Sequence, residues 1–280
     1  MKDLIISCSD TYTWTQLKCW VNSINASGFT GDKVLIAMNC DAETAARVRD
    51  AGFELVCLTK DGDGNCTHTS DIAVVVERFA LYHQFLSSRH YRYVITTDVK
   101  DVVFQRNPSD YLEKHLGDKH LIFSSESICY KDEPWGNANL ASTFCGYVYE
   151  HMKQKEIFNA GVLAGRSHAI RDLSLLLFSG AMDRRIHNSD QAYMNLLLSM
   201  SPFQETSLFV RSEDGWAAQL GTTADPSKIE SFRPVLLEPS PQLVNGEVLT
   251  SKGIPFTIVH QYDRVPEWKA AIEAKFDRSA

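Results

Sequence analysis

The sequence predicts an α/β fold with a mostly parallel central sheet flanked by helices. In its first half, short apolar runs typical of buried strands alternate with segments whose apolar residues recur at helical spacing. Gly28 and Gly52 follow two of the helical segments, where helices commonly end. The chain has 280 residues, 44% of them hydrophobic and 22% charged, as in ordinary globular proteins. Because no internal repeat, low-complexity tract or linker interrupts it, we expect a single domain over residues 1–280.

The elements of this fold can be placed in chain order. Strands are expected at 4–8, 33–38, 53–58, 91–98 and 121–126. Helices are expected over the apolar positions of 14–24, at 42–51, and over 72–86 after a cap at Ser70 or Asp71. The following segments are expected to be irregular at 135–158, strand-like at 159–165, and helical at about 168–182 and 189–200. Residues after 200 hold several prolines and are expected to form short strands, the last of them at 256–260.

The charge balance and the cysteines limit the class of protein. Lys and Arg number 28 against 35 Asp and Glu, a net charge of −7, so we expect no nucleic-acid partner. The seven cysteines show no CxxC pair and no zinc-type spacing, which favours buried free thiols in a reducing compartment. The start of the chain lacks a signal-peptide pattern, and no apolar run approaches the length of about 18 residues that a membrane span needs. We therefore expect a cytoplasmic protein without a membrane span.

Two carboxylates mark the candidate site. Asp98 stands at the end of the expected strand 91–98, and Asp101 follows shortly after it. Ligands of open α/β sheets bind outside the carboxyl ends of the strands, and paired carboxylates suit a hard divalent cation. His260, after the last apolar run, would complete an oxygen-and-imidazole set suited to manganese or magnesium. The alternative is that Asp98 caps a turn, Asp101 is a surface charge and His260 is a hydrogen-bonded core residue.

Motifs that announce other enzymes are absent: the sequence has no Walker loop, GxGxxG, HExxH or GxSxG element. Instead, four stretches stand out for their order and spacing: Arg78-Phe-Ala-Leu-Tyr82, Val94 to Phe104 around Asp98, Phe158-Asn-Ala-Gly-Val162, and Ser189-Asp-Gln191 with Val259-His260. In these stretches the chain resembles the GT-A-fold, nucleotide-sugar-dependent glycosyltransferases, particularly family 8, the glycogenin and lipopolysaccharide galactosyltransferase group. The resemblance runs from the first strand to about residue 268.

The chain departs from this family at the acidic motif. The family has Asp-x-Asp (DxD), whereas this chain has Asp98-Val-Lys-Asp101, with Lys100 where the second acid is expected. Either the turn is one residue longer and both acids still reach the metal, or only one of them binds it directly. We expect both carboxylates to lie near the metal.

The resemblance implies a metal-dependent transferase. It would move a sugar, a hexose or a pentose such as xylose, from a UDP-sugar to a hydroxyl of a glycan or glycoconjugate acceptor. A Mn²⁺ or Mg²⁺ ion, held by Asp98, Asp101 and His260, would neutralise the charge that develops on the leaving diphosphate. Residues 1–165 would form the nucleotide-sugar-binding part, and residues 166–280 the acceptor-binding and closing part.

The resemblance also implies which residues meet the donor. The nucleobase and ribose would lie against Ser7, Cys8, Ser9 and Tyr12, and the diphosphate or the sugar against Arg78, Thr97, Asp98, Asn159, Ala160, Gly161 and Gln191. Asp190 would be the general base of an inverting reaction, or with Gln191 would steady the oxocarbenium character of a retaining one. Simple packing for Tyr12, a surface ion pair for Arg78 and a helix-dipole role for Asp190 are the alternatives.

Aromatic residues and one further acid are candidates for the acceptor side. Trp135, Trp216, Tyr262 and Trp268 could stack on sugar rings, although ordinary packing is the favoured explanation for each of them singly. Glu126, at the end of the fifth strand, is a second candidate base or acceptor contact.

Two other functions remain open at this point. A sugar nucleotidyltransferase would normally carry a glycine-rich basic loop after the first strand, and Ser9-Asp-Thr-Tyr-Thr13 is neither glycine-rich nor basic. A catalytically silent carbohydrate-binding protein with the same fold is the second alternative, and Lys100 within the acidic motif favours it.

Overall fold

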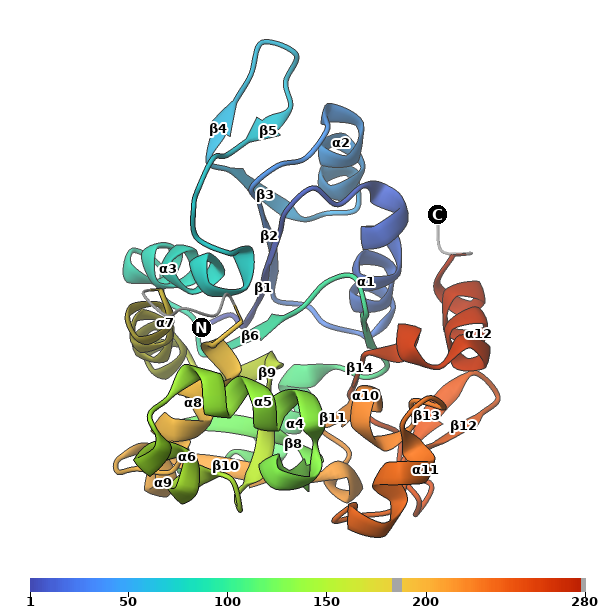
Figure 1. Cartoon of the computed structure of the whole chain (residues 1–280). Helices are drawn as coiled ribbons and strands as arrows, with labels where there is room; N and C mark the ends of the chain where they lie inside the picture. The colour runs from blue at the N-terminus through green and yellow to red at the C-terminus, as the bar shows by residue number, and fades with distance from the viewer. Residues whose placement is uncertain (183–187, 278–280) are drawn as a thin grey trace.

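The computed structural model describes residues 1–182 and 188–277 (Figure 1). The strands are Leu4–Ser9 (β1), Asp32–Ala37 (β2), Glu54–Cys57 (β3), Thr59–Lys60 (β4), Cys66–Thr67 (β5), Tyr93–Thr97 (β6), Val102–Phe104 (β7), Leu121–Cys129 (β8), Glu156–Arg166 (β9), Ser207–Val210 (β10), Ala217–Gln219 (β11), Gln242–Val244 (β12), Glu247–Leu249 (β13) and Ile258–His260 (β14). The α-helices are Trp14–Ala26 (α1), Ala42–Asp50 (α2), Val74–Ser87 (α3), Pro108–His115 (α4), Pro134–Thr143 (α5), Gly146–Met152 (α6), Ser167–Ala181 (α7), Asp190–Leu198 (α8), Phe203–Thr206 (α9), Leu220–Thr223 (α10), Ile229–Phe232 (α11) and Pro266–Phe276 (α12). Single 3₁₀ turns lie at Tyr130–Asp132 (η1), Ser212–Asp214 (η2), Arg233–Val235 (η3) and Tyr262–Arg264 (η4).

The described residues build a central sheet of seven strands in the order β10-β8-β9-β6-β1-β2-β3. β1 pairs in parallel with β2 and β6, β2 with β3, and β10 with β8. Only β9 runs against its two neighbours in this sheet. The predicted α/β fold with a mostly parallel central sheet is therefore confirmed.

Both faces of the sheet are covered, because neighbouring residues of a strand point to opposite faces. On one face, Leu4 and Ile6 of β1 belong to an apolar cluster with residues of α3, α7 and α8. On the other face, Ile5 of β1 packs with residues of α1 and α4. Figure 1 shows α3 and α7 on one side of the strands and α1 on the other. In this three-layer arrangement the first turns of α3 lie beside the carboxyl ends of β1 and β6, where the Arg78 side chain contacts Asp98.

A smaller sheet brings the end of the chain to these strand ends. It has the order β11-β14-β7, with β14 parallel to β11 and antiparallel to β7. Because β7 follows β6 directly, this sheet joins residues near 100 to residues near 260. α12 then packs on α1, where the Asn22 side chain donates a 2.8 Å hydrogen bond to the carbonyl of Phe276.

The segment 135–158 was expected to be irregular, and this expectation is wrong. It forms α5, α6 and the first part of β9. The carboxylate of Glu133 caps α5 by accepting a hydrogen bond from the Gly136 N–H, and Pro134 fills the first turn. The apolar period is weak because α5 carries asparagines among its few apolar residues, so the helix was not visible in the pattern. Similarly, α12 was not expected, although Pro266 at its start and the alanines that follow favour a helix.

The expected cap of α3 is also wrong. The helix begins at Val74, after Ala73, and the Ser70 hydroxyl instead accepts a hydrogen bond from the Ile72 N–H in a local turn. This turn competes with helix formation and delays the helix by a few residues.

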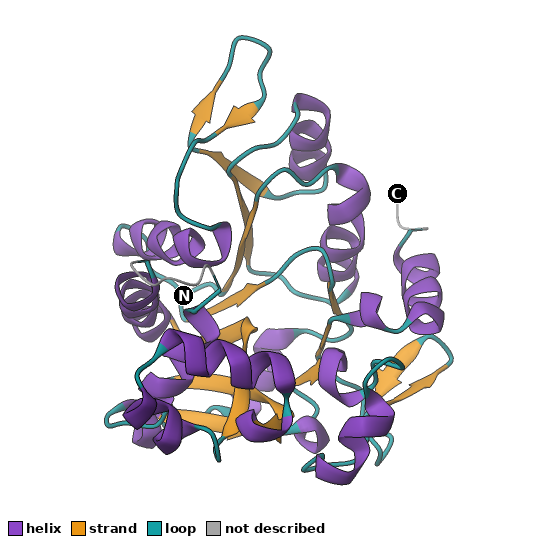
Figure 2. Cartoon of the chain, in the orientation of Figure 1, coloured by secondary structure: helices purple, strands orange, loops and turns teal. Residues whose placement is uncertain are grey.

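Two cysteines differ from the expectation of free thiols. Cys57, at the end of β3, and Cys66, in β5, form a disulfide with their Cα atoms 5.2 Å apart. The turn of the β4–β5 hairpin, which projects from the sheet in Figure 2, brings Cys66 back to β3. The other five cysteines are free thiols, as expected. Cys8, Cys19 and Cys40 are buried, whereas Cys129 is half-buried and Cys145 is exposed.

None of the helices within residues 1–182 and 188–277 has both the length and the apolar character needed to cross a membrane.

Candidate metal and nucleotide-sugar site

The two acidic residues lie where the two sheets meet. β6 ends at Thr97, and the N–H of Asp98 donates a 2.8 Å hydrogen bond to the carbonyl of Gly161 in β9. The next turn leads into β7, whose first residue, Val102, pairs with His260 of β14. The carbonyl of Asp101 accepts a 2.8 Å hydrogen bond from the Gln261 N–H. Asp101 is therefore fixed to the same ladder that positions His260.

The three predicted metal ligands come together. His260 Nε2 lies 3.5 Å from Asp98 Oδ2 and 3.8 Å from Asp101 Oδ1, and one ligand atom of each residue lies within 4.8 Å of the others. Two ligands at about 2.1 Å from one ion lie about 3–4.2 Å apart, so the two distances from His260 Nε2 to the carboxylate oxygens fit a shared cation. Carboxylate oxygens and one imidazole suit manganese or magnesium. The residues present therefore fit the metal that the sequence predicted.

The charges at this cluster shift the acidity of its members. Burial lowers the pKa of His260, but Asp101 and Asp98 outweigh this effect and hold it above its ordinary value. Burial raises the pKa of Asp98, but Arg78 and His260 outweigh it and hold this pKa well below the usual range. Burial raises the pKa of Asp101, and Asp98 adds to that rise. The cluster thus carries more negative charge than its own imidazole balances.

Arg78 is the cation that balances part of this charge. Arg78 is only 8% exposed, so it is no surface residue. It donates hydrogen bonds to Asp98 and, at 3.3 Å, to Asp190 Oδ2 at the start of α8. Its Nη2 also lies 3.4 Å from the carbonyl of Ala160. Arg78 therefore connects the candidate metal ligands to Asp190, the predicted catalytic carboxylate. Burial raises the pKa of Asp190, although Arg78 opposes this rise.

A second network lies beside Arg78. Asn159 Oδ1 accepts a 2.6 Å hydrogen bond from the Gly161 N–H, and its Nδ2 donates to Glu126 Oε1 at 2.8 Å. Gln191 Oε1 accepts from the Ala160 N–H at 3.1 Å, and its Nε2 donates to the same Glu126 oxygen at 3.0 Å. Burial raises the pKa of Glu126, and the two amides oppose that rise. The network fixes the strand that was predicted to frame the sugar.

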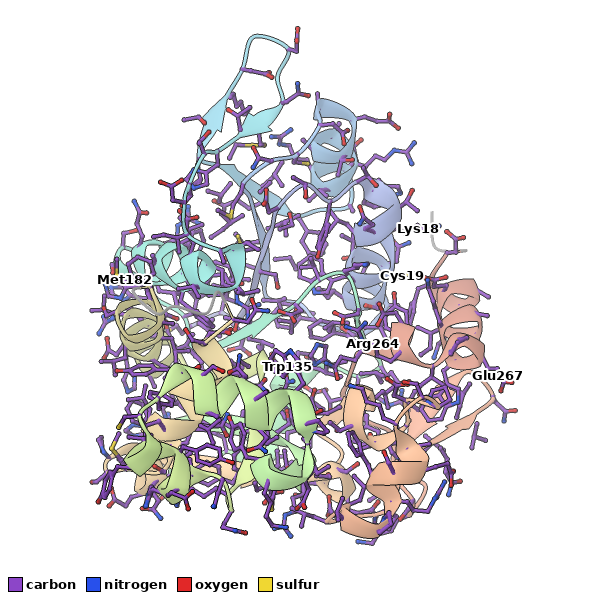
Figure 3. The ribbon with its side chains drawn as sticks, in the orientation of Figure 1. Lys18, Cys19, Trp135, Met182, Arg264 and Glu267 are labelled. Carbon is purple, nitrogen blue, oxygen red and sulfur yellow. A yellow bond between two sulfur atoms is a disulfide. The ribbon has the colours of Figure 1, made fainter. Side chains whose placement is uncertain are left out.

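Two clefts meet at Arg78 and Asp98. The larger one, of about 500 Å³, contains Asp190, Glu126 and His260 in its walls. Its wall also includes Trp135 of α5 and Arg264 of η4, both labelled in Figure 3. The smaller one, of about 240 Å³, is lined by residues at the end of β1 and in the segments that follow β1 and β6: Cys8, Ser9, Asp10, Tyr12, Lys100 and Asp101. Arg78, Asp98 and Arg264 line both, so the two clefts adjoin at these residues, and together they are called the groove here.

Some predicted residues lie beneath the groove instead of lining it. Ser7 and Thr97 are buried, and their hydroxyls lie 3.2 Å apart in a hydrogen bond. Among the aromatic candidates, Trp216 is fully buried against Tyr111, and Tyr262 is buried with its hydroxyl donating to the carbonyl of Lys100. For Trp216 and Tyr262, packing is therefore the correct reading.

A residue that contacts a candidate metal ligand was not predicted from the sequence. Gln219 of β11 is paired with His260 in the smaller sheet, and its Oε1 lies 2.7 Å from His260 Nδ1. No local motif marks it, because the contact arises only when two strands far apart in the sequence pair.

No protein-family model and no curated protein sequence matches the chain. Solved structures do resemble it. The match to the WbbM bifunctional glycosyltransferase covers 99% of this chain and 50% of the WbbM chain, with a TM-score of 0.62 and 12% sequence identity. The glycosyltransferase GlyE of Streptococcus pneumoniae TIGR4 matches 100% of this chain over 64% of its own, with a TM-score of 0.51 and 14% identity. The chain has a glycosyltransferase fold. It spans only part of either neighbour, and the likeness in sequence is too low to transfer an activity.

Proposed function

We propose that the chain is a metal-dependent glycosyltransferase that moves a sugar from a UDP-sugar to a hydroxyl of a glycan or glycoconjugate. The observation that carries the proposal is the convergence of Asp98, Asp101 and His260 at the junction of the two clefts. If the nucleotide occupies one cleft and the reacting sugar the other, the diphosphate that joins them has to lie between the clefts, next to this cation. The fold shared with glycosyltransferases is consistent with this use.

In this proposal the smaller cleft takes the nucleotide. Its walls come mainly from residues 1–165, with Asp263 and Arg264 closing it from the second part of the chain. Tyr12 offers an aromatic face, and Cys8 and Ser9 offer backbone groups at the end of β1, which together suffice for a uracil and a ribose. The larger cleft then takes the donor sugar and the acceptor, with residues from both parts of the chain.

The residues around the reacting centre have distinct tasks. When bound, the divalent cation stabilises the charge on the leaving diphosphate as a Lewis acid. Arg78 offers a second, permanent positive charge next to it. Asn159, Gly161 and Gln191 hold the strand β9 against the sugar, where amide groups and a close backbone can meet sugar hydroxyls.

Transfer breaks the bond between the anomeric carbon and the diphosphate oxygen and forms a bond to the acceptor oxygen, whose proton must be taken up. In an inverting reaction Asp190 takes this proton, since it is the buried carboxylate of the larger cleft that contacts Arg78. In a retaining reaction the proton passes to the departing diphosphate, and Asp190 with Gln191 stabilises the positive charge on the sugar. We also propose that the chain has the GT-A fold and is a member of family 8.

The experiment is a calorimetric titration of UDP with and without Mn²⁺, followed by a panel of UDP-sugars. We expect binding that needs the metal and that is lost in Asp98→Asn and His260→Ala. Asp118→Asn, an exposed aspartate outside both clefts, is the matched control and should bind as the unaltered chain does.

This titration, an assay for sugar-nucleotide formation and a measurement of glycan binding together decide between the alternatives. Binding of UDP that ignores Mn²⁺ would contradict the metal site. Formation of a sugar nucleotide from a sugar phosphate and a nucleoside triphosphate would favour the nucleotidyltransferase. Binding of glycans without any binding of a nucleotide would favour the silent carbohydrate-binding protein.

A further inference from the structure

The imidazole of His260 is hydrogen-bonded to Gln219, and Gln219 is in turn hydrogen-bonded to Ser124. Gln219 Oε1 lies 2.7 Å from His260 Nδ1, and Gln219 Nε2 donates a 2.9 Å hydrogen bond to Ser124 Oγ in β8. The three residues are at most 2% exposed. These contacts are therefore shielded from bulk solvent, and Gln219 is the hydrogen-bond partner of the imidazole on its inner side.

Strand pairing gives this contact its geometry. Gln219 and His260 are register partners in the parallel pair of β11 and β14, so their side chains leave the same face of the smaller sheet. The carbonyl of Gln219 in turn accepts a 2.7 Å hydrogen bond from the Thr223 hydroxyl, which fixes the turn into α10. The glutamine is therefore held at both its backbone and its side chain.

The chemistry of an amide oxygen decides the protonation of the ring. An amide oxygen accepts hydrogen bonds and cannot donate them, so the imidazole nitrogen that faces it carries the proton. With the proton on Nδ1, neutral His260 presents an unprotonated Nε2 toward Asp98 and Asp101, which lie 3.5 and 3.8 Å away. That nitrogen is the one that a cation at these carboxylates would need.

We propose that Gln219 is a positioning residue of the metal site: it fixes the orientation and tautomer of His260 and thereby sets the affinity of the site for a divalent cation. The inference rests on the proposed metal-dependent function. Glutamine suits this position because it supplies an acceptor without adding a charge to a cluster that already holds Asp98, Asp101 and Glu126 within reach of His260.

The test measures Mn²⁺ binding to the purified full chain by the loss of the free-ion signal in electron paramagnetic resonance. Gln219→Met keeps the length of the side chain and removes the acceptor, and we expect about a 10- to 100-fold loss of Mn²⁺ affinity. Gln219→Glu restores an acceptor and should recover most of this loss. Gln105→Met is the matched control, because Gln105 is also a buried, hydrogen-bonded glutamine, but its side chain is bonded to the backbone of Val248 and Phe256 and not to a candidate metal ligand. It should lower the melting temperature without changing the affinity for Mn²⁺.

A second measurement does not depend on the folding of any variant at position 219. In metal-free protein labelled with ¹⁵N-histidine, at a pH where the ring is neutral, the shifts of the ring nitrogens report which one carries the proton. The signals of His260 are those that vanish in His260→Ala. A proton on Nδ1 supports the inference, and a proton on Nε2 overturns it.

The two proposals fail in different ways. If Gln219→Met binds Mn²⁺ as tightly as the unaltered chain while His260→Ala does not, the role of Gln219 is wrong and the metal site stands. If the unaltered chain binds no Mn²⁺, the metal-dependent function is overturned, and the role of Gln219 with it.

Discussion

The substitution Gly161→Ala tests how closely the site is packed. A Cβ atom at this position would lie 2.5 Å from His260 Cε1 and 2.9 Å from Asp98 Oδ2. It would also lie 2.9 Å from Asn159 Oδ1. Gly161 has no left-handed backbone conformation, so alanine brings no backbone strain and acts through these contacts alone.

The size of the effect follows from these distances. Ordinary carbon–carbon contacts begin at about 3.5 Å, so the ring of His260 or strand β9 would have to move by about 1 Å. Metal–ligand distances tolerate only about 0.2 Å, so a movement of this size removes His260 as a ligand. We expect the affinity for Mn²⁺ to fall by about two orders of magnitude. Overpacking should also lower the free energy of unfolding by about 1–3 kcal/mol.

The assay is the Mn²⁺-dependent binding of UDP, with thermal unfolding of the same samples. Gly146→Ala is the matched control, because a Cβ at Gly146, the first residue of α6, would meet no atom within 4 Å. It should leave both the binding and the unfolding temperature unchanged. Native Mn²⁺ affinity in Gly161→Ala would refute the packing that we describe around the ligands.

Three further predictions concern the charges of the site. Arg78→Leu leaves the carboxylate of Asp190 buried without its partner and should lower the free energy of unfolding in urea by about 3–5 kcal/mol. The control Arg89→Leu breaks an exposed ion pair and should lower it by at most about 1 kcal/mol. Equal losses of stability in the two variants would contradict this account. Asp190→Asn should leave the Mn²⁺-dependent binding of UDP nearly intact and reduce sugar transfer, and full transfer activity would exclude Asp190 as a base. Because Asp101 helps to hold the pKa of His260 above 6.5, the protonated ring should stabilise the metal-free protein at acidic pH, and this contribution should vanish as the pH rises through the raised pKa. The affinity for Mn²⁺ should rise over the same interval, and an affinity that is flat with pH would remove His260 as a ligand.

The regular half of the fold could be predicted because local and global signals agree there. β1, β2 and β6 each contain a run of apolar residues, as is typical of strands buried on both faces, and the helices between them show one apolar face. The same regularity predicted Asp98 as a site residue, since it directly follows a buried strand. Prediction failed where tertiary packing, and not the local pattern, determines the structure, as in α5, whose polar residues obscure its one buried side.

The disulfide and the glutamine behind His260 could not be predicted for a related reason. Cys57 and Cys66 meet only because the β4–β5 hairpin folds back on β3, and the spacing of nine residues carries no signal by itself. Gln219 meets His260 only through the pairing of β11 with β14. Contacts of this kind depend on the register of distant strands, which a single sequence does not contain.

The longer acidic motif shows how such pairing can compensate for a local departure. An additional residue between two acids changes the direction of the second side chain if the backbone is free. Here the carbonyl of Asp101 is bonded to the N–H of Gln261, and Val102 is paired with His260, so the position of Asp101 is set by β14 as much as by Asp98. Residues 99–100 thus join two ends that are held by different sheets, Asp98 by β9 and Asp101 by the segment after β14. The distance between the carboxylates thus depends on how the two sheets meet, and the number of residues between them is a poor measure of whether both can reach one ion.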